Sequence, residues 1–326
     1  MWWKCAVAVM MLAGLGLAST PGYGQWPERG LTLVASPPAD LPWSDEPDPQ
    51  LTILKELLPR ISRELGVPVT LAEQPGGREM LSANMVALAR PDGYMFGALA
   101  PDPVISWEIQ GYTPYTRKEF TPVATAWRVV YAIIVPADTP AEGLRALAQD
   151  GKQPRLAQTG LEPASVGTVM AMEAALAAGF KWTLAKVDRL DPELLLQGRA
   201  EAMVLPLSHF KVYPKADRFK VLTVLSNAYA PCVGDWPTLE SQGLEVEPNP
   251  LTSFYLPNKV NWRIRSRLSA ALNNALRQPA MVRRLGEACL IPYIEDLEGA
   301  VDAADREYAR EETRLRAQGL PAAEGQ

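Results

Sequence analysis

The stretch TPVATAWRVVYAIIVP, Thr121 to Pro136, is a long β-prone run in the middle of an alternating pattern of strands and helices. We expect this run to carry the chain out of one lobe and into a second. Towards the end of the sequence another β-rich segment follows, LTSFYLP, Leu251 to Pro257. A chain that leaves one lobe, builds another and returns makes two connections, which is the geometry of a hinged clamshell.

Short β-rich runs alternate with helical patterns on both sides of this stretch, which predicts an α/β architecture with largely parallel sheets. Strands are expected at LTLVAS (31–36), VTLAE (69–73) and YMFGALA (94–100), and later at RLAQ, TLAKV, AEAMVL and KVLTVLS. A helix between the first two strands places Leu54, Leu57, Leu58, Ile61 and Leu65 on one face. Pro59 is expected to interrupt that helix.

The chain has 326 residues, a length more natural for two domains than for one. Residues 1–25 resemble a cleavable secretory signal: one Lys, an apolar run from Cys5 to Ala18 that is short for a bilayer, then small and turn-forming residues. We therefore expect a mature start near Gln25 or Trp26 and a location in the periplasm. A retained membrane anchor is the alternative.

The formal charge of the chain is −5, and removal of residues 1–25, which hold one Lys and no acid, makes it −6. A mildly acidic protein lacks the basic footprint of a nucleic-acid binder, so we expect no nucleic-acid partner.

Few residues offer metal, redox or catalytic chemistry. Cys232 and Cys289 are compatible with a disulfide and equally with two buried thiols, because the sequence does not report their separation. The single histidine, His209, has no partner histidine for a zinc site. Since no Ser/His/Asp order or nucleophile elbow is visible, we expect no metal, no cofactor and no enzyme activity.

The ordered set of segments resembles the extracytoplasmic solute-binding proteins of the tripartite tricarboxylate transporter family, often called Bug proteins. The resemblance runs along nearly the whole mature chain and is carried by WPERGLTLVAS, EQPGG, ARPDGYMFGALA, EFTPVATAWRVVYAIIVPADTP, LLLQGRAEAMV and RLSAALNNALRQPAMVRRLGEACLIP. It implies a type II Venus flytrap, a two-lobed periplasmic binding protein with a hinge. Residues 26–124 with 250–326 would form lobe 1, and residues 125–249 would form lobe 2.

The resemblance also implies a function. A small organic solute, usually an acid, would be gripped in the cleft through backbone amides of loops and helix N-termini. Hinge closure would then present the bound state to membrane transporter subunits. We expect such a receptor to be a monomer.

In lobe 1 the resemblance places three loops at the ligand. The loop after the first strand has lost two family glycines and gained an acid, so its backbone approaches an anion less closely. A second loop keeps Gly77 and adds Arg78, which could form a bidentate fork to a carboxylate or pair with a surface acid. The ligand-binding candidates of lobe 1 are Ser36, Pro38, Ala39, Asp40, Gly77, Arg78, Ala100 and Asp102.

In lobe 2 the segment QTGLEPASVG matches the family's small-residue turn before a helix and contributes Thr159, Gly160, Glu162 and Ser165. Glu162 would either favour the helix dipole or repel a carboxylate in the cleft. Leu205 stands where the family pattern has a second acid. These departures keep the scaffold but alter the anion-binding loops, so an amide, a cation-bearing acid or a larger apolar solute fits the cleft equally well.

Three functions therefore compete. The first is a receptor that captures a small organic solute, a carboxylate by the resemblance, and delivers it to a tripartite tricarboxylate type transporter. The second is a divergent sensory or partner-binding protein with altered ligand preference. The third is an enzyme on this scaffold that uses single acids such as Glu162 or Glu201.

Overall fold

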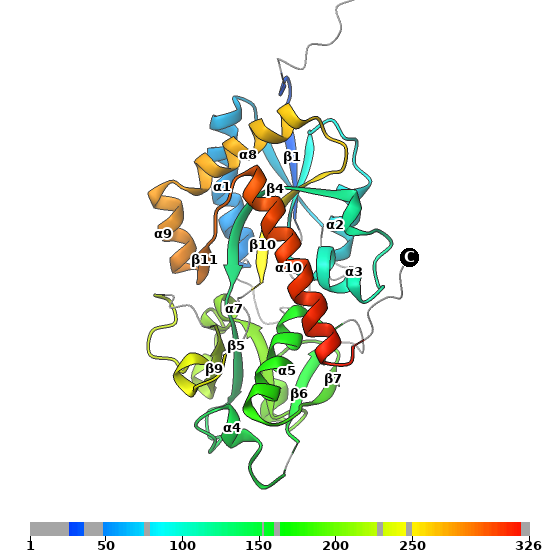
Figure 1. Ribbon diagram of the computed structural model, residues 1–326. Coiled ribbons are helices and arrows are strands. Elements are labelled where there is room, and N and C mark those ends of the chain that lie inside the picture. Colours follow the sequence, from blue (N-terminus) through cyan, green and yellow to red (C-terminus); the bar gives the residue numbers. More distant parts are fainter. Residues whose placement is uncertain are drawn as a thin grey trace, which may run out of the picture.

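The strands of the molecule form two separate sheets, which lie in the upper and lower halves of Figure 1. The first sheet contains β1 (Leu31–Ala35), β2 (Val69–Glu73), β3 (Met95–Leu99), β4 (Phe120–Val129), β10 (Leu251–Pro257) and β11 (Leu290–Pro292), and the second contains β5 (Tyr131–Pro136), β6 (Arg155–Thr159), β7 (Thr183–Val187), β8 (Ala202–Pro206) and β9 (Phe219–Leu225). Their strand orders are β11-β4-β10-β3-β1-β2 and β7-β6-β8-β5-β9. We call the part around the six-stranded sheet lobe 1 and the part around the five-stranded sheet lobe 2, and the two-lobed α/β fold is as expected.

The computed structural model describes residues 26–35, 48–74, 79–151, 153–159, 164–226, 231–245 and 250–320. The expected signal segment, residues 1–25, lies outside this range. So do eight of the ligand-binding candidates, namely Ser36, Pro38, Ala39, Asp40, Gly77, Arg78, Gly160 and Glu162. Within the described part of the chain, no helix combines the length and the apolar character that crossing a membrane requires.

The β-prone run from Thr121 to Pro136 crosses between the lobes, as the sequence predicts. Its first part is β4, which pairs with β10 and β11, and its second part is β5, which pairs with β8 and β9. Val130 separates the two strands. The lobe boundary expected between residues 124 and 125 lies inside β4, and the chain passes back to lobe 1 between β9 and β10.

The expectation of largely parallel sheets is wrong in part, because both sheets are mixed. In lobe 1, β1 pairs in parallel with β2 and β3, whereas β10 is antiparallel to β3 and β4. In lobe 2, β6 is parallel to β7 and β8, whereas β5 is antiparallel to β8 and β9. Parallel neighbours need a crossover helix within one lobe, and the strands that border the lobe crossings lack one.

Helices cover both faces of the lobe 1 sheet. One face carries α1 (Pro49–Leu65), α8 (Trp262–Leu276) and α9 (Pro279–Glu287), and the other carries α2 (Met80–Ala87), α3 (Trp107–Ile109) and α10 (Leu297–Ala317). Alternation along β1 serves both cores: Leu31 and Leu33 belong to the first and Val34 to the second. In Figure 1, α10 runs from lobe 1 down toward lobe 2.

Helix α1 shows how local chemistry sets an element's ends. Asp48 caps its start by accepting a 2.8 Å hydrogen bond from the backbone N–H of Leu51, and Gly66 ends it in the left-handed conformation at φ 75°. The helix continues through Pro59 without the expected interruption. Burial of Leu57 and Ile61 on the face beside that proline supplies packing energy that outweighs the lost backbone hydrogen bond.

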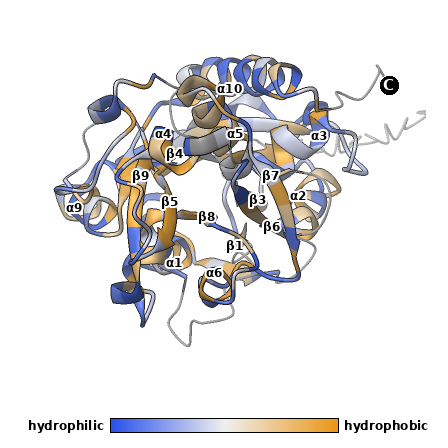
Figure 2. Ribbon diagram, turned by 90° about the horizontal axis from the view of Figure 1, so that it is seen from below, coloured by the Kyte–Doolittle hydropathy of each residue, from blue (hydrophilic) through white to orange (hydrophobic). Residues whose placement is uncertain are grey.

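The lobe 2 sheet is also packed on both faces. Its helices are α4 (Leu144–Leu147), α5 (Val166–Ala178), α6 (Glu193–Leu196) and α7 (Leu207–Lys211). Figure 2 shows the strands β5 and β9 largely in orange, on the left of the view. Ala164 and Val169, at the start of α5, belong to the apolar cluster of lobe 1 that also contains Leu99 and Leu315, so the two lobes share a hydrophobic contact.

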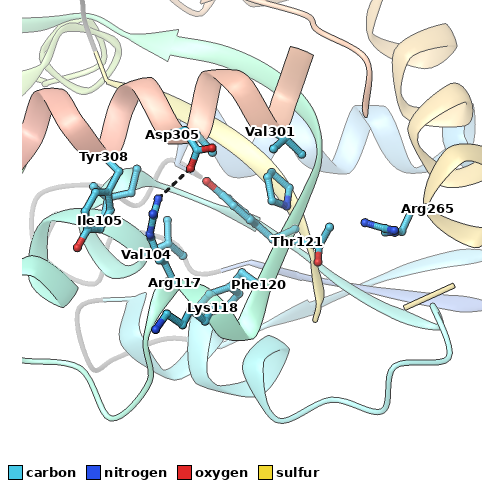
Figure 3. Close-up of a pocket in the computed structure, with 13 residues that line it drawn as sticks. Val104, Ile105, Arg117, Lys118, Phe120, Thr121, Arg265, Val301, Asp305 and Tyr308 are labelled. Atoms are coloured by element: carbon cyan, nitrogen blue, oxygen red, sulfur yellow. Dashed lines mark hydrogen bonds and ion pairs between the residues drawn. The ribbon is translucent and has the colours of Figure 1, made fainter. Parts of the chain in front are cut away.

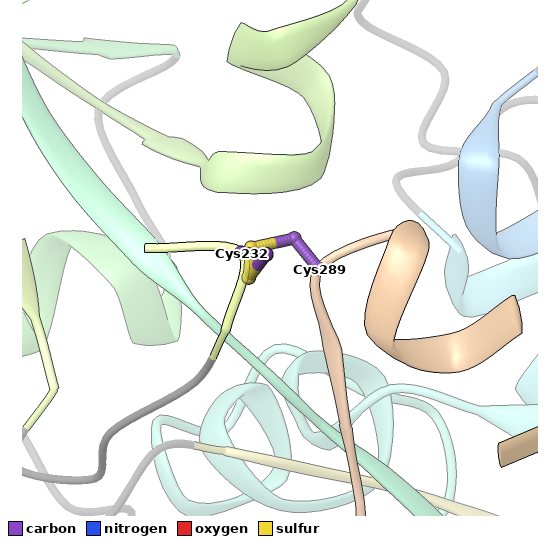
Figure 4. Close-up of a disulfide and its surroundings, with 2 residues drawn as sticks. All are labelled: Cys232 and Cys289. Carbon is purple, nitrogen blue, oxygen red and sulfur yellow. A yellow bond between two sulfur atoms is a disulfide. The ribbon is translucent and has the colours of Figure 1, made fainter. Parts of the chain in front are cut away.

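A disulfide between Cys232 and Cys289 joins the lobes, which decides between the two alternatives left open by the sequence. Cys232 follows β9 of lobe 2, and Cys289 precedes β11 of lobe 1; the Cα atoms are 5.3 Å apart (Figure 4). Cys289 is buried against apolar side chains of lobe 2. The covalent link therefore lies beside the crossing strands.

Candidate ligand-binding site

A cavity of about 130 Å³ lies between the lobes, where the carboxyl ends of β3 and β6 meet. In open α/β sheets this edge is the usual place for a ligand. All five ligand-binding candidates that the structure describes line it: Ala100, Asp102, Thr159, Ser165 and Leu205. The other described residues that line it are Gln50, Glu79, Pro101, Trp107, Val129, Tyr131, Gly167, Leu190, Val204, Pro206 and His209.

The secondary structure explains why these five side chains converge. Ala100 directly follows β3, and Asp102 begins a short π-helical turn (Asp102–Ser106) that continues from it. Thr159 is the last residue of β6, Ser165 is the N-cap of α5, and Leu205 lies in β8. Each is thus placed by the end of a strand or the start of a helix, so the cavity has a rigid frame.

Asp102 makes a direct bond across the cavity. Its Oδ1 atom accepts a hydrogen bond of 2.6 Å from the backbone N–H of Val166, the first residue of α5. Ser165 caps the same helix by accepting a hydrogen bond of 3.3 Å from the backbone N–H of Thr168. A carboxylate of lobe 1 therefore sits at the positive end of a lobe 2 helix, the position that favours negative charge.

Further polar contacts close the lobes around the cavity. The Gln110 side chain makes two hydrogen bonds of 3.0 Å with the backbone of Ala164, donating to its carbonyl and accepting from its N–H. Farther out, Arg314 of α10 donates to Glu173 of α5 at 3.0 Å. These side chains are buried or half-buried, so the contacts are protected from water and hold α5 against lobe 1.

His209 of α7, which lines the cavity, faces Asp48 at the start of α1. His209 Nε2 and Asp48 Oδ2 lie 2.6 Å apart and both side chains are buried, although their alignment falls short of a hydrogen bond. His209 is buried, and it links the lobes at the edge of the cavity.

The described wall of the cavity is acidic. Burial, together with the negative charges of Asp102, Glu79 and Glu311, raises the pKa of Tyr131 well above its ordinary value. The Tyr131 hydroxyl therefore stays protonated and can donate a hydrogen bond in the cavity. Glu79 caps α2 with a left-handed backbone, φ 71°, which is uncommon for a residue other than glycine.

Reasoning from the sequence missed several of the lining residues. Tyr131 lies in the crossing strand, and its place in the cavity could have been suspected from that position. Glu79 and Gln50 carried no signal, because their approach depends on how α2 and α1 begin. Trp107 also lines the cavity and could stack on a solute, whereas Trp127 is buried in the lobe 1 core.

Glu201, one of the acids considered for catalysis, has a structural role. Its carboxylate accepts hydrogen bonds of 2.6 to 3.1 Å from the Arg155 guanidinium and one of 2.7 Å from the Arg155 backbone N–H. The side-chain hydrogen bond from Arg155 is the main cause that lowers the pKa of Glu201. It does not line the cavity between the lobes.

A second and larger cavity, of about 360 Å³, lies entirely within lobe 1, beside α10 (Figure 3). Val104, Ile105 and Phe120 form part of its apolar wall, and Arg117 pairs with Asp305 at 2.9 Å at its edge. Because lobe 2 contributes none of its described lining, a ligand there would not be enclosed by lobe closure. The smaller cavity is therefore the better candidate.

Two α/β lobes, two connections of the chain between them and a cavity lined by both lobes define the class of two-lobed solute-binding proteins. Residues 53–320 match the model of the tripartite tricarboxylate transporter family receptor, TctC. The chain belongs to this family.

Individual comparisons agree with this assignment. The chain is 25% identical over 283 residues to a UPF0065 protein in the TAR-I ttuE-ttuC' intergenic region of Agrobacterium vitis, covering 82% of this chain and 79% of the relative. Among solved structures it is similar to R. palustris Rpa4515 with adipate (20% identity, TM-score 0.75, 91% and 99% of the two chains). It is also similar to MatC from Rhodopseudomonas palustris with bound malate (19% identity, TM-score 0.69, 89% and 100%). At these identities the solved structures establish the fold.

Proposed function

We propose that this protein is a periplasmic receptor that captures a small organic solute, a carboxylic acid, in the cavity between its lobes. The observation that carries the proposal is that Ala100 and Asp102 of lobe 1 and Thr159, Ser165 and Leu205 of lobe 2 line one cavity. A ligand held by both lobes stabilises the closed arrangement, which is how such a fold reports occupancy to a partner. The structural neighbours with adipate and malate support an acid as the solute class.

The remaining parts of the proposal rest on family membership and on the sequence of residues 1–25. The receptor acts as a monomer, reaches the periplasm by means of a cleavable signal in residues 1–25, and delivers its solute unchanged to subunits of a tripartite tricarboxylate type transporter. It uses no cofactor, metal or nucleic acid. Deletion of its gene should abolish uptake of the solute, and the wild-type gene should restore it.

Thermal unfolding in the presence of a panel of small organic acids tests solute capture. A solute at 100 times its dissociation constant should stabilise the protein by about 2.7 kcal/mol. Thr159→Val removes a hydroxyl from the cavity and should weaken binding about tenfold. Thr183→Val makes the same change on the exposed strand β7 and should leave binding unaltered.

Two results would overturn the proposal. If no solute raises the unfolding temperature and none copurifies in native mass spectrometry, the result favours the sensory or partner-binding alternative. If both threonine variants lose affinity equally, the solute binds elsewhere, and the cavity of lobe 1 in Figure 3 becomes the site to examine.

A further inference from the structure

Asp102 occupies the place where a solute carboxylate would find its strongest electrostatic partner in lobe 2. The start of a helix offers free N–H groups and a partial positive charge. In this protein the Val166 N–H at the start of the 13-residue helix α5 is already bonded, at 2.6 Å, to the Asp102 carboxylate.

Two further backbone N–H groups near the start of α5 are engaged as well. The Ala164 N–H donates to Gln110 at 3.0 Å, and the Thr168 N–H donates to the Ser165 hydroxyl at 3.3 Å. A solute carboxylate that bound the Val166 N–H would have to displace the Asp102 carboxylate from its charge-assisted hydrogen bond.

The charge of the cavity wall also disfavours a carboxylate. Among the described residues that line the cavity, Glu79 and Asp102 are acidic and none is Lys or Arg. A carboxylate at this end would be repelled by both acids, whereas an ammonium or amide N–H would meet acceptors. The geometry and the charge therefore disfavour the same ligand group.

We propose that Asp102 determines the ligand specificity of this receptor: the solute presents a hydrogen-bond-donating group, an ammonium or an amide, to the α5 end of the cavity, and not a carboxylate. This inference rests on the proposed function and narrows it to carboxylic acids whose other end carries such a donor. Asp102 acts as a built-in anion that completes the start of α5 when the lobes close.

Isothermal titration with two probes of equal chain length tests the inference. Adipate has a carboxylate at each end, and 6-aminohexanoate replaces one of them with an ammonium. Wild-type protein should bind 6-aminohexanoate at least about tenfold more tightly than adipate, the ratio expected from one charge-assisted hydrogen bond. Asp102→Ala frees the Val166 N–H and should reverse the order, with a gain of about tenfold or more for adipate.

Two further variants separate specificity from stability. Asp102→Asn keeps an oxygen that can accept from Val166 but removes the charge, so it should fold normally and lose most of the preference for the ammonium. Asp302→Ala removes an exposed acid on α10, away from the cavity lining, and should leave both affinities unchanged. Thermal unfolding of each variant confirms that it is folded.

The inference is overturned if wild-type protein prefers adipate, or if folded Asp102→Ala gains no affinity for adipate, because the helix start would then be available and unused. Failure of the proposed function gives a different result. In that case wild-type protein binds no solute of a broad panel. Adipate binding by Asp102→Ala alone would then show that the start of α5 accepts a carboxylate once Asp102 is removed.

Discussion

Removal of the Cys232–Cys289 disulfide should destabilise the protein strongly, because this bond spans both lobes. The cysteines are 57 residues apart in sequence, and the closed loop contains β10, α8 and α9. The chain entropy that a cross-link of this span removes from the unfolded state corresponds to about 4 kcal/mol at 25 °C. Both cysteines changed to serine should therefore lower the free energy of unfolding by about that amount.

Urea denaturation of the wild-type protein and of the double serine variant measures this difference. A reductant should lower the stability of the wild type toward that of the variant and leave the variant unchanged. Small-angle scattering should also show a wider range of lobe separations after reduction, since Cys232 and Cys289 join the lobes beside the crossing strands. A loss below about 1 kcal/mol, or an equal effect of reductant on the variant, would refute the reasoning.

Three other perturbations test the regions around the cavity. Burial raises the pKa of Glu311 from 4.5 to about 7, so between these pH values the native state binds more protons than the unfolded state. The free energy of unfolding of the protein should therefore fall by roughly 3 kcal/mol as the pH rises from 4.5 through 7. Urea titrations at several pH values should show this slope in the wild type and a flatter one in Glu311→Gln. Gly167→Ala would place a Cβ atom 2.8 Å from the Tyr131 ring, so it should lower the free energy of unfolding by about 1–3 kcal/mol and weaken solute binding. Gly286→Ala, whose Cβ would have no atom within 4 Å, should leave stability unchanged or raise it. Glu79→Gly and Lys259→Gly should each relieve the strain of a left-handed backbone conformation and raise the free energy of unfolding by about 1 kcal/mol. Only Glu79→Gly should alter solute binding, because Glu79 lines the cavity. Equal effects of the two variants on binding would contradict that placement.

The alternative of a partner-binding protein can be tested by whether the lobes open to admit a solute. Asp102, Gln110 and Arg314 make direct contacts between the lobes. If these contacts hold the lobes closed permanently, solutes will not enter and the protein will not change shape. Scattering with and without the solutes of the panel distinguishes the two roles.

The elements of the fold could be predicted from local sequence. Strand patterns such as VTLAE and TLAKV are β2 and β7, and Asp48 and Gly66 set the ends of α1 by their own side-chain and backbone chemistry. The ordered motifs were enough to indicate the family and the two lobes. Ala100, Asp102, Thr159, Ser165 and Leu205 were also singled out as site residues, because the family resemblance places their loops at the ligand; the structure shows that each adjoins a strand end or a helix start.

Tertiary structure decided what those residues meet. Which N–H reaches Asp102, and that His209 lies against Asp48, depend on how two lobes separated in sequence close on each other, and no local pattern encodes that distance. The disulfide pairing also depends on the tertiary structure, because it requires the Cα atoms of two residues 57 positions apart to come within a few ångströms of each other. Local propensity acts over a few residues, whereas the cavity and its charge arise from contacts between elements far apart in the chain.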